Sequence, residues 1–190
     1  MSLWGASTTD ESKPKHLTDA EKRDVYATKE GWVKRTAGTG GRAGRVHEEI
    51  LVAIGELAGG TSTTAGLARG TISSVRFIST ALGAVAGDAS FSAEVVYNEA
   101  VDVVTTGGTP QMTITNTPGS DVVLDYASGT GTNRLTFTAT VAGGATAEND
   151  VLSIAAGNIA LNSGTIQDAE TNVDSGLTHG AGTTTITVAA

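Results

Sequence analysis

The chain has 190 residues, no cysteine, and a formal net charge of −8 at pH 7. The absence of cysteine excludes disulfides, thiolate catalysis and Cys-ligated zinc. The acidic balance argues against general nucleic-acid affinity, because phosphate binding needs a concentrated basic surface.

The charges divide unevenly at about residue 80. Of the 12 Lys and Arg residues, 11 precede residue 81 and only Arg134 follows it, whereas nine acidic residues precede and 11 follow. The differences between those counts are +2 for residues 1–80 and −10 for residues 81–190. This division favours an N-terminal docking segment and an acidic C-terminal domain that repels its neighbours.

The opening of the chain has neither helical nor strand periodicity, which predicts an extended arm over residues 1–17. Thr18 and Glu21 then have the S/T-x-x-E spacing of a capping box. This spacing predicts a helix that runs to about residue 29 or 30, where a glycine follows.

Two strands are expected in the rest of the N-terminal segment, with a third segment that fits either element. Trp32–Arg35 and Thr71–Thr80 read as strands, and a glycine-rich loop covers residues 38–44. Val46–Leu57 fits a helical face or a strand face, and its β-branched residues favour the strand. Residues 81–88 are the expected linker.

Beyond the linker, apolar and polar residues alternate in one segment after another. The clearest inward sets are Phe91, Ala93, Val95 and Tyr97; Met112 and Ile114; Val122, Leu124 and Tyr126; and Leu135, Phe137, Ala139 and Val141. Turn residues separate these runs at spacings of roughly 8–12 residues, the pattern of a β-sandwich. We therefore predict an all-β fold, with no helices to support a parallel α/β sheet.

The order of short motifs within Asn98–Val173 is informative. An "EAV" strand precedes a "GTP" turn, a "YASGTGT" hairpin, an "LTF" strand and the segment "LNSGTIQD" at 161–168. This order resembles the Ig-like repeat of bacterial surface proteins and phage structural proteins. The resemblance implies an Ig-like sandwich over about residues 82–190. It says little about function, since such modules serve unrelated roles.

The opening segment carries a second set of motifs. Over residues 3–54, "LWG", "TDE" and "KPKHL" lead into "GWV" and then "GRAGRVHEEILVA". This order is similar to a virion structural family of marine tailed phages. The resemblance implies that the chain is a component of a phage particle, without saying which part.

Enzymatic motifs match poorly. Gly38-x-Gly40-x-x-Ala43 has the glycine spacing of a dinucleotide site, but no alternating α/β pattern surrounds it. His47-Glu48 lacks a second histidine at position 51, which is Leu51. The three histidines are spread over three segments, which disfavours a catalytic triad. We expect no enzyme activity and no cofactor.

One acidic run has the oxygen spacing of a calcium loop. Its members are Asp168, Glu170, Asn172 and Asp174. The glycine and the closing glutamate of an EF-hand are missing at the required spacing. The run is better interpreted as a solvated acidic turn than as a calcium site. We therefore predict no metal site.

The basic residues of the N-terminal segment gather near two tryptophans. The candidate partner-binding residues are Trp4, Trp32, Lys34, Arg35, Arg42 and Arg45. Arginine makes bidentate contacts with carboxylates, and aromatic side chains dominate many interfaces, so an acidic protein surface is the expected partner. A small nucleic-acid patch, a solvated loop and a local aromatic cluster remain as alternatives.

Taken together, these patterns predict a non-enzymatic virion protein that decorates or cements the capsid. The expected partner is the major capsid protein or another virion protein, with copies arranged as homo-oligomers or on the particle lattice. No nucleic acid or membrane is expected to bind, and the predicted location is the particle surface. The alternatives are a tail, neck or fibre component, and an Ig-like adhesion module that binds carbohydrate or calcium. A hydrolase is the remote third.

Overall fold

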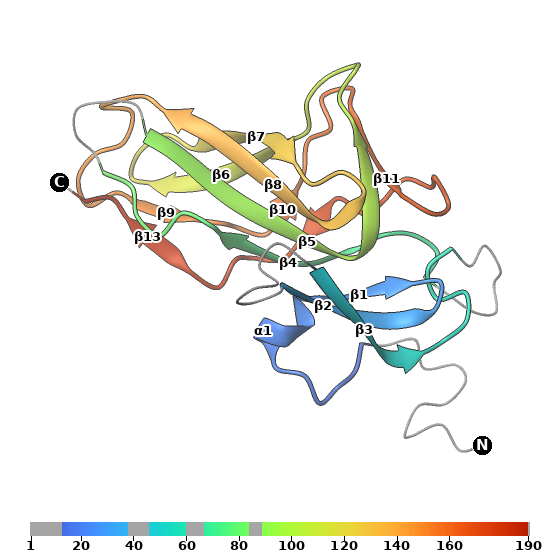
Figure 1. Cartoon of the computed structure of the whole chain (residues 1–190). Coiled ribbons are helices and arrows are strands. Elements are labelled where there is room, and N and C mark those ends of the chain that lie inside the picture. Colours follow the sequence, from blue (N-terminus) through green and yellow to red (C-terminus); the bar gives the residue numbers. More distant parts are fainter. Residues whose placement is uncertain (1–12, 38–45, 60–66, 84–88, 190) are drawn as a thin grey trace.

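The computed structural model describes residues 13–37, 46–59, 67–83 and 89–189. Over these residues the regular secondary structure is β apart from a single short helix (Figure 1). A small N-terminal sheet lies below a larger sandwich in the view of Figure 1. The predicted all-β fold is confirmed, and so is the short helix that precedes it. No helix of the described residues is long and apolar enough to cross a membrane.

The predicted capping box is present, but the helix that it begins is only one turn long. In α1 (Asp19–Lys22), the Glu21 amide donates to Thr18 Oγ1 at 3.3 Å and the Thr18 amide donates to Glu21 Oε2 at 3.0 Å. The expected continuation to residue 29 or 30 is wrong. Strand β1 (Val25–Thr28) follows instead, because its alternating side chains are buried against a neighbouring strand.

The glycine predicted to end the helix lies in a hairpin turn. Gly31 has φ of +130°, and a Cβ at this position would stand 2.0 Å from the Val52 carbonyl oxygen. It begins β2 (Gly31–Ala37), which pairs antiparallel with β1 on one side and with β3 (Val46–Ala53) on the other. The strand reading of the segment from Val46 is thereby confirmed.

The three strands β1–β3 form what we call the N-terminal sheet, which has its own small core. The core consists of Leu17, Val25, Ala27, Trp32, Leu57 and Ala58. Burial of these side chains holds the sheet against the segments before and after it, at roughly 1.5–3 kcal/mol for each large apolar side chain.

The remaining strands build the sandwich. They are β4 (Ile72–Phe77), β5 (Ala89–Val104), β6 (Gln111–Thr117), β7 (Val122–Ser128), β8 (Thr132–Val141), β9 (Val151–Ser153), β10 (Gly157–Asn158), β11 (Thr165–Asp168), β12 (Thr178–His179) and β13 (Thr185–Thr187). β5 pairs with β4, β8 and β11, and β8 continues through β7 to β6. The first half of β6 pairs with β7 and the second half with β9, which carries the sheet on to β13.

The alternation read from the sequence matches the burial. Phe91, Ala93, Val95 and Tyr97 of β5 are all fully buried in the sandwich core. The inward residues of β6 and β8 join them, including Met112, Ile114, Leu135 and Phe137. Period 2 predicts the core faces because each side chain's direction follows from its position in the strand.

The packing places the start of the sandwich before residue 80. Strand β4 pairs antiparallel with β5, and its Val75 and Phe77 belong to the sandwich core. The Phe77 and Phe91 rings lie 5.3 Å apart between centroids. By core membership the sandwich therefore begins with β4, whereas the charge count places the division at residue 80. Of the expected linker, residues 84–88 lie outside the described part, and Leu82 is buried.

A pair of buried carboxyl groups lies where β5 pairs with β11. Glu99 and Asp168 are each only 1% exposed. Asp168 Oδ1 accepts hydrogen bonds from the Glu170 amide at 2.9 Å and the Thr171 amide at 2.8 Å. Burial, followed by the charge of Asp168, raises the pKa of Glu99 from 4.5 to about 9. Glu99 therefore keeps its proton in the folded chain at neutral pH.

Because Glu99 is buried beside Asp168, we expect the free energy of unfolding to fall as the pH rises. The folded chain holds the Glu99 proton up to about pH 9, while the unfolded chain releases it near 4.5. The contribution of Glu99 is therefore fully present below about pH 4.5 and is lost as the pH rises towards 9. At about pH 8, Glu99→Gln should raise the free energy of unfolding by about 2–4 kcal/mol and flatten its pH dependence.

Urea unfolding at several pH values measures this effect, with Glu148→Gln at an exposed turn as the matched control. A Glu99→Gln variant that is less stable than the natural chain at about pH 8 would show that Glu99 is ionised and stabilising.

Candidate functional site

The N-terminal sheet is tied to the sandwich by Arg134. Its Nη2 donates to the Arg23 carbonyl oxygen at 3.0 Å and to Asp24 Oδ1, both just before β1. Its Nη1 donates to Glu94 Oε2 on β5 at 3.3 Å. The planar guanidinium has five donors in a fixed fork, so one side chain can serve both parts of the molecule.

The acidic partner in this contact is buried. Glu94 is 7% exposed, and its second oxygen, Oε1, accepts from Arg76 Nε on β4 at 2.8 Å. Val96, one pleat along the same face of β5, is fully buried although it lies outside the sandwich core. The outer face of β5 is thus covered, and a buried carboxylate there depends on its two arginines.

Backbone and surface contacts complete the junction. β1 pairs with β5 through one parallel bridge, Ala27 with Glu99. Lys29 Nζ lies 2.7 Å from Glu170 Oε2, but both side chains are about half exposed. An exposed ion pair contributes about 0–1 kcal/mol, so Arg134 is the stronger tie.

The structure separates the candidate partner-binding residues. Trp32 is 2% exposed and lies in the small core, so its side chain is not presented to a partner. Lys34 Nζ lies 3.1 Å from Glu21 Oε1, and Arg35 Nε lies 3.9 Å from Glu48 Oε1. Trp4, Arg42 and Arg45 lie outside the described residues, as do most of the predicted arm and the loop at 38–44.

Strand β3 is the most exposed strand of the N-terminal sheet. The bridge between β1 and β5 joins the N-terminal sheet to the strands of the sandwich, and β3 lies at the end of this combined strand order. No described strand pairs with its other edge. Val46 and Ile50 are 51% and 48% exposed. An exposed edge strand with apolar side chains is a template for pairing with another chain. The pattern of Val46–Leu57 favours a strand, but it does not indicate that these two side chains face solvent.

Val46 and Ile50 share their face of the sheet with polar and apolar neighbours, of which Val33 is buried. Val33 pairs with Ile50, and Arg35 pairs with Glu48. The Tyr26 hydroxyl donates to Glu48 Oε1 at 2.9 Å. Burial, then this hydrogen bond, raises the pKa of Tyr26 to about 12, so the hydroxyl stays protonated. Glu48 is therefore held within the sheet by its neighbours.

The candidate calcium residues do not converge. Asp168 is buried and its Oδ1 caps the following turn, while Glu170 pairs with Lys29. Asp174 Oδ1 accepts from Gln167 Nε2 at 3.1 Å. Asn172 is exposed, in the left-handed region at φ of +57°. Within the described ranges, no three His, Cys, Asp or Glu residues are grouped so as to hold a metal ion.

Comparison with protein-family models, with curated proteins and with solved structures finds no match.

Removal of the Arg134 side chain should loosen the N-terminal sheet locally. Arg134→Gln leaves Glu94 buried with one arginine and removes the link to Asp24, at a cost of about 2–3 kcal/mol. Amide hydrogen exchange in Val25–Thr28 should accelerate, while exchange in β7 stays unchanged. Arg69→Gln, which removes an exposed arginine, is the matched control. Unchanged exchange in β1 would contradict the assigned role of Arg134.

Proposed function

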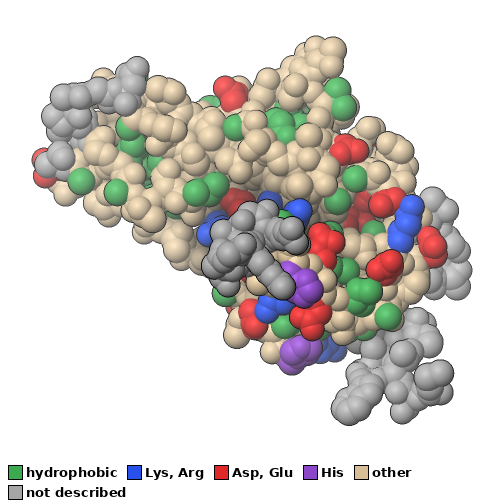
Figure 2. All heavy atoms as spheres, viewed as in Figure 1, with side chains coloured by type: hydrophobic (Ala, Val, Ile, Leu, Met, Phe, Trp, Pro, Cys, Tyr) green, Lys and Arg blue, Asp and Glu red, His purple; other side chains and the backbone are tan. Residues whose placement is uncertain are grey.

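We propose that this chain is a virion structural protein that decorates or cements the capsid of a tailed phage. The N-terminal sheet attaches it, and the sandwich is displayed. The proposal is supported by the resemblance of residues 3–54 to a phage virion family and by the exposed edge of β3 in the basic half of the chain. Figure 2 shows charged side chains of both signs over the N-terminal part, whereas the visible face of the sandwich is largely uncharged.

The observation that carries the proposal is the β3 edge. A partner strand that adds to an edge gains main-chain hydrogen bonds, and apolar side chains beside it give specificity. Val46 and Ile50 supply such side chains at the exposed end of the sheet. The proposed partner is therefore a strand of the major capsid protein or of another virion protein.

The ion pairs within the sheet refine how attachment occurs. Lys34 and Arg35 are engaged by Glu21 and Glu48. Their charges are therefore partly neutralised before any partner arrives. Attachment through β3 depends more on backbone pairing and apolar contact than on these two cations, and many such weak contacts gain strength when repeated over a lattice.

The contact between the N-terminal sheet and the sandwich is consistent with a displayed domain. Because Arg134 contacts Asp24 and Glu94 together, the sandwich keeps a defined orientation on the attached sheet. The net charge of −10 after residue 80 disfavours contact between neighbouring displayed domains.

The structure gives less support to the alternative hypothesis of a carbohydrate-binding adhesion module than to attachment. Sugar platforms need exposed aromatic rings, whereas Tyr97 is fully buried and Tyr126 packs edge-on against Phe137 at 6.0 Å. The Tyr126 hydroxyl also accepts from the Thr130 amide at 2.8 Å. We therefore put forward attachment rather than sugar binding.

A charge placed on the β3 edge should abolish attachment. Val46→Asp combined with Ile50→Asp removes the apolar contact and repels the partner strand, so co-sedimentation with capsid shells should fall about tenfold or more. Val123→Asp is the matched control, because Val123 is 47% exposed on sandwich strand β7.

Retention of binding by the β3 variant and loss by the Val123 variant would reverse the proposed orientation. Failure of the natural chain to bind shells, together with binding to isolated tails, would replace decoration with a tail role.

A further inference from the structure

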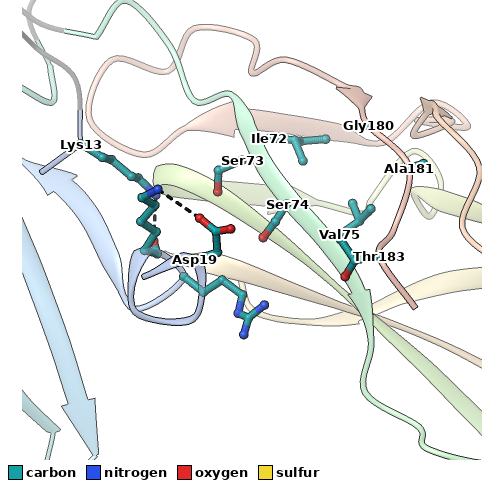
Figure 3. A pocket seen from close by; sticks show the side chains of 11 residues that line it. Lys13, Asp19, Ile72, Ser73, Ser74, Val75, Gly180, Ala181 and Thr183 are labelled. Carbon is teal, nitrogen blue, oxygen red and sulfur yellow. Dashed lines mark hydrogen bonds and ion pairs between the residues drawn. The ribbon is translucent and has the colours of Figure 1, made fainter. Parts of the chain in front are cut away.

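A cleft of about 300 Å³ lies where the N-terminal part meets the sandwich. Figure 3 shows Lys13 and Asp19 on one side, and Ser73 and Ser74 of β4 on the other. The segment after β12 closes the cleft with Gly180, Ala181 and Thr183. The cleft is therefore lined from three separate parts of the chain.

The lining is positively charged in a chain of net charge −8. It contains Lys13, Lys22 and Arg23 but only one carboxylate, Asp19, which pairs with Lys22 at 3.1 Å. Lys13 Nζ donates to the Lys22 carbonyl oxygen at 3.1 Å, which brings it to the same end of the cleft. Two positive charges thus remain without a carboxylate among the lining residues.

The electrostatic cost of this arrangement is visible at Lys13. Burial, followed by the charge of Lys22, lowers the pKa of Lys13 to about 8. An anion bound beside Lys13 would oppose this lowering, because it would stabilise the charged form of Lys13.

The opposite wall offers hydroxyl groups. Ser73 Oγ already donates to the Val96 carbonyl oxygen at 2.9 Å. Ser74 Oγ is buried with no hydrogen-bond partner among the described residues. A buried hydroxyl without a partner is unfavourable and uncommon, so this group is available to a ligand in the cleft.

We propose that this cleft binds a small molecule that carries a phosphate group. The phosphate oxygens would accept hydrogen bonds from Lys13, from the Arg23 guanidinium and from Ser74 Oγ. The volume is at the lower end of the range for small-ligand pockets, about 300–1,000 Å³. It leaves space beside the phosphate for a small organic group against Ile72 and Val75.

Binding would also strengthen the junction. Lys13, Lys22 and Arg23 belong to the N-terminal part, whereas Ser74 belongs to β4 of the sandwich. A ligand held by both sides favours the docked arrangement, because binding to the folded form alone stabilises it. This inference is independent of capsid attachment.

Calorimetric titration of the full chain at neutral pH and constant ionic strength tests the proposal. The probes are inorganic phosphate, glycerol 3-phosphate and acetate. We expect a Kd of about 1 mM or tighter for glycerol 3-phosphate, weaker binding of inorganic phosphate, and still weaker binding of acetate. Equal affinity for the first two would identify the free ion as the ligand. No binding of either phosphate probe, or equal binding of acetate, would overturn the proposal.

Variants locate the binding to the cleft. Lys13→Gln and Ser74→Ala should each weaken phosphate binding, by about tenfold for the lysine. Ser74→Ala removes only an unpartnered hydroxyl, so its stability without ligand should equal or exceed that of the natural chain. Arg69→Gln is the charge-matched control outside the cleft. An equal loss of affinity in Arg69→Gln would show general charge attraction and overturn the assignment.

Discussion

The arrangement of the two parts depends on the contact of Arg134 with Glu94 and Asp24. The only Lys or Arg after residue 80, Arg134, lies on β8 and contacts both the sandwich strand β5 and the start of the N-terminal sheet. Glu94 is buried, so its charge is tolerable only while arginine donors are present. The uneven charge distribution of the chain thus leaves one cation in the acidic half, at the place where the two halves meet.

The features that sequence predicted well are local. The core face of β5 follows from alternation of Phe91, Ala93, Val95 and Tyr97, since side-chain direction in a strand is set by position alone. The capping box is equally local, because Thr18 and Glu21 contact each other within one turn. These predictions needed no knowledge of which strands pair.

The features that sequence missed require distant partners. The capping box predicts a longer helix, yet Val25–Thr28 forms a strand that pairs with β2. The charge count groups β4 with the N-terminal segment, because charge composition carries no information about its pairing with β5. Likewise, the acidic run at Asp168 could not be placed beside Glu99 until β11 was paired with β5. Propensity and composition give way to tertiary contacts at each of these positions.

The length of β5 has a consequence for the order of assembly during synthesis. This one strand pairs with β1, β4, β8 and β11, so the N-terminal sheet and the sandwich share it. The N-terminal sheet leaves the ribosome first, but Glu94 and Arg134 are made later. Until residue 134 has emerged, the sheet has only its small core to hold it, because the contacts of Arg134 with Asp24 and Glu94 cannot yet form. The time taken to synthesise β5 to β8 therefore sets how long the nascent N-terminal sheet lacks its support from the sandwich.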